Sequence, residues 1–221
     1  MRTFGWLVGE IVRRIDGRTI GCYLAEEIAA PLGLDYWIGV PEEHESRVAR
    51  LVPPAQGMAA LIDLLGADNL LARVGTNPGG WFDYDDQWNS RARHACELPS
   101  SNGVGTVRSV ARLYASLLGP VDGVQTLAPV TVAEAARGRV RGPDAVLMIE
   151  TAFGLGLMLP PSLAPGCGPR SFGHSGAGGS LAFADPDAGL AVAYAPNHLR
   201  FDPAGDARTI GLLRRILRRA G

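Results

Sequence analysis

The stretch FGHSGAGGSLAFADPDAGLAVAYAPN, residues 172–197, places a serine between glycines and beside a histidine. Ser175 and His174 are the residue types of nucleophilic catalysis, in which a histidine takes the proton from a serine hydroxyl that attacks a carbonyl carbon. A glycine-rich hairpin whose histidine has no chemical role would show the same composition. The chain on either side of the serine must distinguish these interpretations.

The sequence GHSGA, residues 173–177, departs from the nucleophile elbow G-x-S-x-G of α/β-hydrolases only in its last residue. An elbow needs a strand before the serine and a helix directly after it. Residues 178–189 predict a strand that runs into a turn and then another strand. We therefore expect Ser175 to lie on a strand and not to act as the nucleophile.

A self-sufficient α/β-hydrolase is still an alternative, with Ser175, His198 and an acid as its triad. That fold uses the chain order serine, acid, histidine. Asp202 follows His198, so the acid would have to be Asp185 or Asp187.

Apolar residues at helical spacing dominate the chain before this stretch. The predicted helices cover 4–15, a segment capped by Thr19 that ends before Pro31, 57–66, a segment capped by Thr106, and 130–137. Residues 31–56 predict an irregular connection with one short strand near 36–40, and residues 76–103 a long, folded loop that forms a cleft wall.

Short apolar runs separated by Pro, Gly and Asp predict antiparallel strands at 153–159, 170–175, 179–185 and 189–195. A last helix, begun by Asp202 and Pro203, is predicted to close the chain. Helices first, then a sheet, then a terminal helix indicate an α+β fold.

Composition excludes several partners. The 221 residues carry a net charge of −1, which gives no field to attract nucleic acid or an anionic membrane. Three widely spaced cysteines predict neither a disulfide framework nor a zinc site, and no stretch has the apolar length of a signal peptide core or a membrane span. We expect a cytoplasmic protein.

All 21 basic residues are arginine, so a lysine base is excluded within these residues.

Three segments of the chain resemble motifs of a single superfamily. FGWLVGEIVRRIDGRTIGCYLAEEIAAPLGLDYWIG, residues 4–39, resembles a helical segment with the pattern G-x-L-x-x-E-x-x-x-G-x-[ST] that runs into I-x-x-P-L-G-[ML]. SSNGVGTVRSVARLYASLL, residues 100–118, resembles a Gly-x-x-Thr-capped helix, and FGHSGAGG, residues 172–179, resembles a third motif, where H-x-G often replaces K-T-G. The superfamily that has these segments is that of the serine β-lactamases and penicillin-recognising enzymes. The pattern is most similar to class C β-lactamase-like esterases and covers nearly the whole chain, which implies the β-lactamase/transpeptidase-like fold.

The resemblance implies roles for the four residues of the third motif. His174 would polarise the substrate or support a proton relay, and Ser175 would be a hydrogen-bonding side chain in the cleft and not a nucleophile. Gly176 would let substrate approach the strand, and the backbone N–H of Ala177 would be one of two oxyanion-hole donors. On weaker grounds, the acyl pocket would be lined by four residues: Asn102, Trp88, Asn89 and His94. The segment that carries them could equally be a surface loop without a role in the site.

The chain departs from the family where the family keeps its nucleophile. The first motif, S-x-x-K, cannot occur in a chain without lysine, and the second motif, with its catalytic tyrosine or serine, would fall just before Gly5. We therefore expect residues 1–221 to be the C-terminal part of one β-lactamase-like serine hydrolase domain, and this part to be inactive alone.

Three function classes remain open. They are a truncated acyl-transferring hydrolase, a non-catalytic remnant or binding module with the same cleft, and the α/β-hydrolase described above. The first takes a small ester, amide or β-lactam as substrate. No cofactor is expected, because the histidines (His44, His94, His174, His198) lack metal-ligand spacing. An exposed sheet edge at 189–195 predicts possible self-association.

Overall fold

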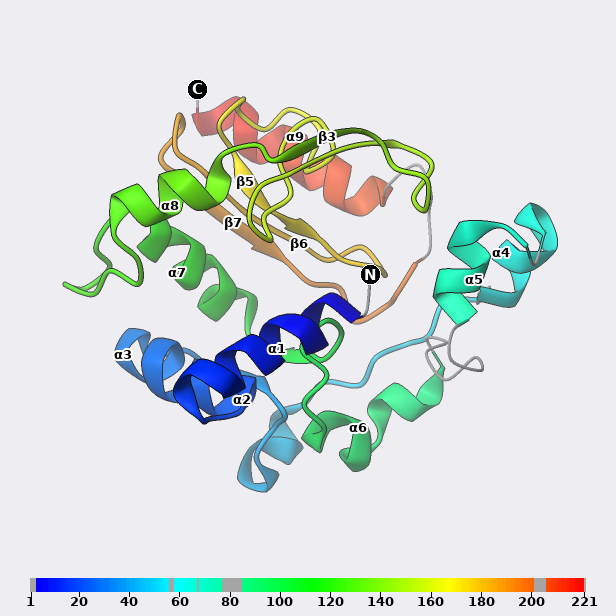
Figure 1. Ribbon diagram of the computed structural model, residues 1–221, viewed down its shortest axis with the longest axis horizontal. Coiled ribbons are helices and arrows are strands. Elements are labelled where there is room, and N and C mark those ends of the chain that lie inside the picture. The colour runs from blue at the N-terminus through cyan, green and yellow to red at the C-terminus, as the bar shows by residue number, and fades with distance from the viewer. Residues whose placement is uncertain (1–2, 56–57, 67, 77–84, 201–205, 221) are drawn as a thin grey trace.

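The computed structural model describes residues 3–55, 58–66, 68–76, 85–200 and 206–220. A twisted antiparallel sheet with helices on both faces forms one side of the molecule, and a set of helices with a small ribbon forms the other (Figure 1). The α+β fold predicted from the sequence is confirmed.

The main sheet is built from five strands. They are β3 (Val140–Pro143), β4 (Glu150–Phe153), β5 (Phe172–Ser175), β6 (Leu181–Asp185) and β7 (Leu190–Tyr194). β3 pairs with β4, and β6 pairs with both β5 and β7, all antiparallel. Met158 bridges Phe153 on β4 and Gly173 on β5, so the two sets of strands are joined.

Alternating side chains of β6 face two different helical layers, as the pleat of a strand requires. Phe183 is fully buried and packs with Val192 of β7 and Leu213 of α9 (Ala207–Ala220). Ala184 packs on the opposite face with Val132 of α8 (Pro129–Ala136) and with apolar residues of α7 (Val107–Leu118). The sheet is therefore fixed between α9 on one face and α7 with α8 on the other.

The helical side begins with α1 (Thr3–Asp16), α2 (Ile20–Tyr23), a π-helical stretch η1 (Leu24–Ala29) and α3 (Ala30–Leu32). It continues with the 3-10 helix η2 (Glu42–Arg47), α4 (Met58–Leu65), α5 (Leu70–Thr76), the 3-10 helix η3 (Asp86–Asn89) and α6 (Arg91–Ala95). A two-stranded ribbon, β1 (Tyr36–Ile38) with β2 (Gly103–Gly105), pairs Trp37 with Val104.

Two predicted helix caps are confirmed. The Thr19 side chain accepts a hydrogen bond from the Cys22 N–H at 3.3 Å, and the Thr106 side chain accepts one from the Ser109 N–H at 3.1 Å. The expected end before Pro31 is wrong, because the helical path runs on to Leu32. Pro31 occupies the first turn of α3, where its missing N–H costs little.

The predicted strand at 153–159 is also wrong over most of its length. β4 ends at Phe153, and only Met158 returns to the sheet. Gly156 between them has φ +73°, which no extended strand adopts. The expected start of the last helix at Asp202 and Pro203 lies outside the described residues. Among the helices the structure describes, none combines the length and apolar character that a bilayer crossing would need.

Candidate active site

His174 lies at the exposed end of β5, opposite Ala182 of β6. Its Nδ1 is 2.6 Å from the Ser175 carbonyl oxygen, and its ring is 6.2 Å from that of Phe153, centroid to centroid. Because a carbonyl oxygen can only accept, Nδ1 carries the proton. In the neutral ring, Nε2 is then left as a proton acceptor that can face a substrate.

Ser175 ends β5 and is half-buried. Its hydroxyl donates to the thioether sulfur of Met158 at 3.6 Å, a weak acceptor and not a base. The chain then makes a turn and enters β6, so the helix required by a nucleophile elbow is replaced by a strand. The elbow interpretation of Ser175 is wrong.

A tight turn follows Ser175. The Gly176 N–H donates to the Ser180 carbonyl at 2.7 Å, and the Gly179 N–H donates to the Gly176 carbonyl at 3.3 Å. Gly178 and Gly179 have φ of +89° and +100°, which strongly favours glycine. Ala177 is exposed at the tip, and among the described residues its N–H has no acceptor. The turn therefore presents a free backbone donor next to His174.

Gly176 lies close to the Ser180 side chain. A Cβ at this position would meet the Ser180 hydroxyl across the turn, and that hydroxyl would have to rotate away. The expected role of Gly176, to let substrate approach the strand, stays a prediction.

The beginning of α9 braces this turn from behind. The Thr209 hydroxyl donates to the Gly179 carbonyl at 2.9 Å, and the Arg200 N–H donates to the Gly178 carbonyl at 3.3 Å. Asp206 caps α9 through the Arg208 N–H at 2.9 Å, and its pKa is lowered because the Arg208 guanidinium binds the carboxylate. Sequence analysis missed these residues, although an aspartate before an amphipathic helix is a recognisable cap signal.

The four residues expected in the acyl pocket lie on η3, on α6 and just before β2. Asn102 is buried, and its amide accepts from the Leu98 N–H at 2.9 Å and donates to the carbonyls of Arg93 and Cys96. Asn89 makes a similar pair of hydrogen bonds with the backbone of Leu51, at 2.7 and 2.9 Å. Both amides thus hold loops in place.

His94 and Trp88 are also buried. His94 Nδ1 lies 2.8 Å from Glu45, whose pKa is lowered by this hydrogen bond and by Arg91. The Arg93 guanidinium lies 5.6 Å from the Trp88 ring centroid. Within the described ranges, Asn89, His94 and Asn102 make no hydrogen bond or ring contact with residues 174–177, so an acyl-pocket role for these residues stays a prediction.

The alternative triad is also wrong. Asp185 is buried at the β6–β7 turn, where its carboxylate accepts from the N–H groups of Gly168, Asp187 and Ala188. Burial alone would raise its pKa, but these donors outweigh that effect and lower it. Asp187 binds Arg170 at 2.7 Å. The Asp185 carboxylate thus closes the turn and the Asp187 carboxylate binds an arginine, and in the described part of the chain neither makes a hydrogen bond to His198.

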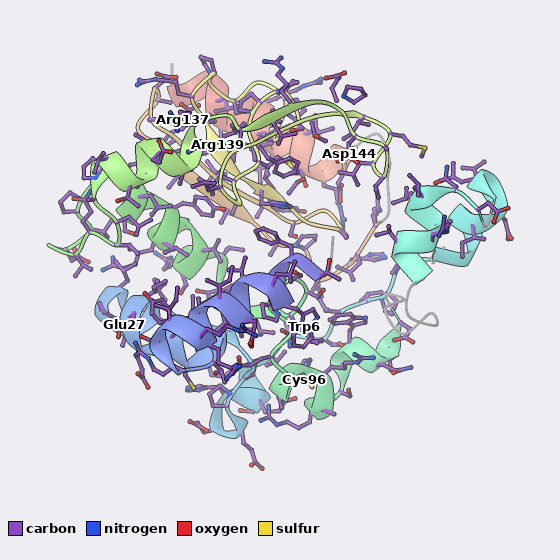
Figure 2. The ribbon with its side chains drawn as sticks, in the orientation of Figure 1. Trp6, Glu27, Cys96, Arg137, Arg139 and Asp144 are labelled. Carbon is purple, nitrogen blue, oxygen red and sulfur yellow. The ribbon has the colours of Figure 1, made fainter. Side chains whose placement is uncertain are left out.

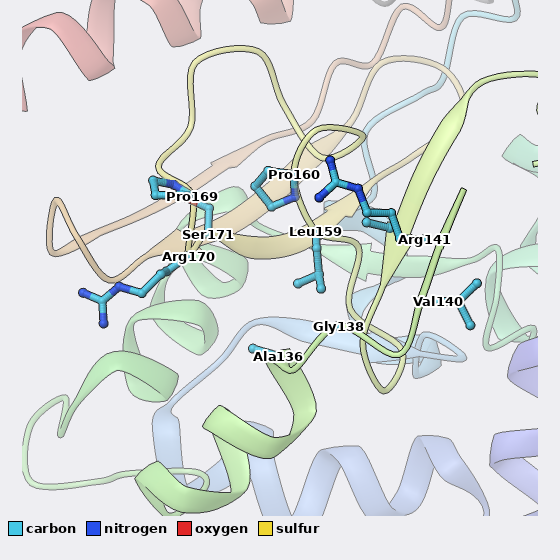
Figure 3. A pocket seen from close by; sticks show the side chains of 10 residues that line it. Ala136, Gly138, Val140, Arg141, Leu159, Pro160, Pro169, Arg170 and Ser171 are labelled. Atoms are coloured by element: carbon cyan, nitrogen blue, oxygen red, sulfur yellow. The ribbon is translucent and has the colours of Figure 1, made fainter. Parts of the chain in front are cut away.

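A pocket of about 250 Å³ lies at the opposite end of β5 (Figure 3). Its lining comes from α8, β3, β4 and the segments that connect these elements and lead into β5: Ala136, Gly138, Val140, Arg141, Ala152, Leu159, Pro160, Pro169, Arg170 and Ser171. The Arg170 guanidinium extends away from Pro160 toward its partner Asp187. None of residues 174–177 lines this pocket, which is therefore distinct from the site at His174.

Comparison with known proteins identifies the fold family. The family model described as Beta-lactamase matches residues 3–215. Esterase/beta-lactamase LipL of Mycobacterium tuberculosis is 32% identical over 208 residues, which cover 89% of this chain and 47% of LipL.

Two solved structures resemble the whole described chain. A penicillin-binding protein homologue from Caulobacter crescentus is 38% identical with a TM-score of 0.81, and the match covers 96% of this chain and 56% of the homologue. EstA from Arthrobacter nitroguajacolicus Rue61a is 27% identical with a TM-score of 0.83, covering 99% of this chain and 58% of EstA.

The chain thus spans about half the length of its relatives. The match extends over both the helical side and the sheet, including the turn after His174. The chain belongs to the Beta-lactamase family.

Proposed function

We propose that this chain is the C-terminal part of an esterase or β-lactamase-like serine hydrolase domain, and that it supplies the oxyanion side of the active site. The observation that carries the proposal is the free N–H of Ala177 beside His174 at the exposed end of β5. A fixed backbone donor of this kind stabilises the negative oxygen that develops when a carbonyl is attacked. Small esters, amides or β-lactams are the substrates that contain such a carbonyl.

The nucleophile must come from polypeptide outside these 221 residues. The family's serine is activated by a lysine, and this chain has arginine at every basic position. The Ser175 hydroxyl faces a sulfur and lacks a base. A serine from elsewhere would lose its hydroxyl proton as it attacks the carbonyl carbon, and the carbonyl oxygen would accept a hydrogen bond from the Ala177 N–H. The bond to the leaving alcohol or amine would then break, and that group would depart with the proton taken from the serine. Water would release the acyl group from the serine and restore the serine hydroxyl proton. In this proposal His174 Nε2 relays the proton from the serine side to the leaving group.

The test compares initial rates with p-nitrophenyl butyrate. Its three forms are the chain alone, its His174→Ala variant, and a chimera that joins this chain to the part of the Caulobacter homologue outside the match. We expect the first two to be equally inactive. The chimera should turn over substrate, and His174→Ala should lower its kcat/KM about a hundredfold or more.

His198→Ala is the matched control, because this histidine is exposed and was the base of the rejected triad. It should leave the chimera unchanged. Turnover by the chain alone that depends on His174 would show that a nucleophile lies within the 221 residues. A folded chimera without turnover would favour a non-catalytic binding module.

A further inference from the structure

The pocket in Figure 3 has a size and a lining that suit a small organic molecule. A cavity of roughly 150 Å³ holds one benzene molecule, so the volume of about 250 Å³ has room for about ten non-hydrogen atoms. Most of its side chains are apolar, among them Ala152, Leu159 and Pro160. Arg141 and Pro169 of the lining are exposed, so the pocket opens to solvent.

Hydrogen bonds hold the walls of the pocket in shape. The Leu159 N–H donates to the Ala152 carbonyl at 2.8 Å, and the Leu159 carbonyl accepts from the Ser162 hydroxyl at 2.9 Å. The same hydroxyl accepts from the Ala152 N–H at 3.2 Å. Beside β3, the Arg139 N–H donates to the Phe153 carbonyl at 2.8 Å. A ligand would therefore enter a preformed pocket and would not have to order these segments.

Arg141 gives the pocket a positive charge that is not neutralised. Its side chain extends from β3 toward Pro160, another residue of the lining (Figure 3). Within the part of the chain that the structure describes, this side chain makes no ion pair and no hydrogen bond. Asp144, three residues later, is occupied, because its carboxylate accepts from the N–H groups of Val146 and Leu147, each at 2.8 Å.

The arginines around Arg141 are already paired. Arg170, the other arginine of the lining, binds Asp187 at 2.7 Å. Arg137 and Arg139, labelled in Figure 2, follow each other at the end of α8 and both bind Glu134. Two guanidinium groups that share one carboxylate leave this side of the pocket positive. A ligand with one negative charge would neutralise the remaining guanidinium.

The combination of apolar walls and one guanidinium favours a carboxylate with an apolar body. A planar guanidinium binds a carboxylate through two parallel hydrogen bonds, a geometry that it matches closely. Inorganic phosphate would bring more charge and strongly hydrated oxygens against apolar walls, which cannot replace their water. A neutral molecule of the same shape would leave the guanidinium without a partner.

We propose that this pocket binds a small organic monocarboxylate, with its carboxylate on Arg141 and its apolar body against Leu159 and Pro160. Ester hydrolysis releases acids of this kind, so the pocket would bind the class of product that the proposed reaction forms. The binding site itself does not depend on that reaction, because its lining lies within residues 136–171 and excludes His174.

The experiment titrates the 221-residue chain with benzoate and with hexanoate, which carry an aromatic and an aliphatic body. Two-dimensional amide NMR should show saturable shifts at Gly138, Ala152 and Leu159. Arg141→Gln should weaken binding about tenfold or more, because the charged hydrogen bonds are lost. Arg137→Gln is the matched control, since it removes the same charge from a residue outside the lining, and should change the affinity by less than about twofold.

Gly138→Leu tests the volume of the pocket. Within 4 Å, a Cβ on Gly138 would meet only the Leu159 side chain, at 3.8 Å, so a larger residue fits without a collision and extends toward the pocket. The leucine should fill part of the space and abolish binding of both acids. If this variant does not fold, Arg141→Gln still decides the question, because position 141 is exposed.

Benzamide and inorganic phosphate test the chemistry of the ligand. Benzamide, which has the shape of benzoate without its charge, should bind about tenfold more weakly or less, and phosphate should not displace benzoate. The inference fails if neither acid gives saturable shifts, if benzamide binds as well as benzoate, or if phosphate competes. It also fails if Arg141→Gln and Arg137→Gln have the same effect.

His174→Ala separates this pocket from the candidate active site. The variant should bind benzoate as well as the unchanged chain does. Loss of benzoate binding on changing His174 would place the acid at the active site and overturn the inference. A chimera that binds benzoate in this pocket but lacks ester turnover would refute the proposed function alone.

Discussion

At the residue scale, the proposed site combines one side chain with one backbone group. His174 would contribute its Nε2, because the Ser175 carbonyl favours the tautomer with the hydrogen on Nδ1, and Ala177 would contribute its backbone N–H. The sequence motif H-x-G predicts both positions, and their roles stay a proposal. The motif could not predict how closely Gly176 approaches the Ser180 hydroxyl, because that contact depends on how tightly the turn closes.

Ser175 provides the first residue-scale prediction. A fluorophosphonate probe should not label it, because its hydroxyl faces the Met158 sulfur and has no base. Peptide mapping of the treated chain would locate any adduct. Stoichiometric modification at Ser175 would mean that the serine is activated after all.

Asp185 provides a prediction about pH. Its pKa is lowered in the folded protein, so the stability it contributes is present above the unfolded carboxyl pKa and lost as pH falls through the folded value. Asp185→Asn should cost about 1–3 kcal/mol of unfolding free energy between pH 5 and 8. Urea titrations of both proteins should show this gap narrowing below about pH 4. A gap that stays constant through acid pH would contradict the assignment.

At the element scale, strongly periodic segments were predictable and weakly patterned ones were not. Helix α1 and helix α7, with its Thr106 cap, match their apolar spacing. Strand β3 was missed because VRGP has a single β-forming residue, Val140, and ends in glycine and proline, so that it forms a strand through its pairing with β4. The π-helical stretch was also missed, since a change of helical register leaves no simple mark in composition.

The start of α9 should position the oxyanion donor. Thr209→Val removes the hydroxyl that donates to the Gly179 carbonyl. It should lower kcat of the chimera several-fold with little change in KM, because the displaced Ala177 N–H would act mainly in the transition state. Thr209→Ser keeps the hydroxyl and should restore kcat. Equal losses in both variants would point to packing alone.

At the scale of the whole molecule, the sequence indicated the fold family and the absence of the S-x-x-K motif from these residues. It did not indicate which helix faces are exposed. The apolar spacing predicts the helix α1, but in the structure its large apolar side chains are exposed because the glycine face, with Gly5 and Gly9, makes the closer contact. Composition cannot show which face of a helix meets its own chain. The exposure of these side chains therefore became visible only in the structure.

The junction between the two sides of the molecule has a consequence for folding kinetics. The Val52 N–H donates to the Asn197 carbonyl at 2.7 Å, and the Asn197 amide reaches the Arg50 carbonyl across 147 positions of the chain. Closing so long a loop is entropically costly and should come late, after the local helices and hairpins have formed. Asn197→Ala should then speed unfolding and leave the refolding rate nearly unchanged, which stopped-flow measurements in urea can resolve. Slower refolding would instead place this junction in the folding nucleus.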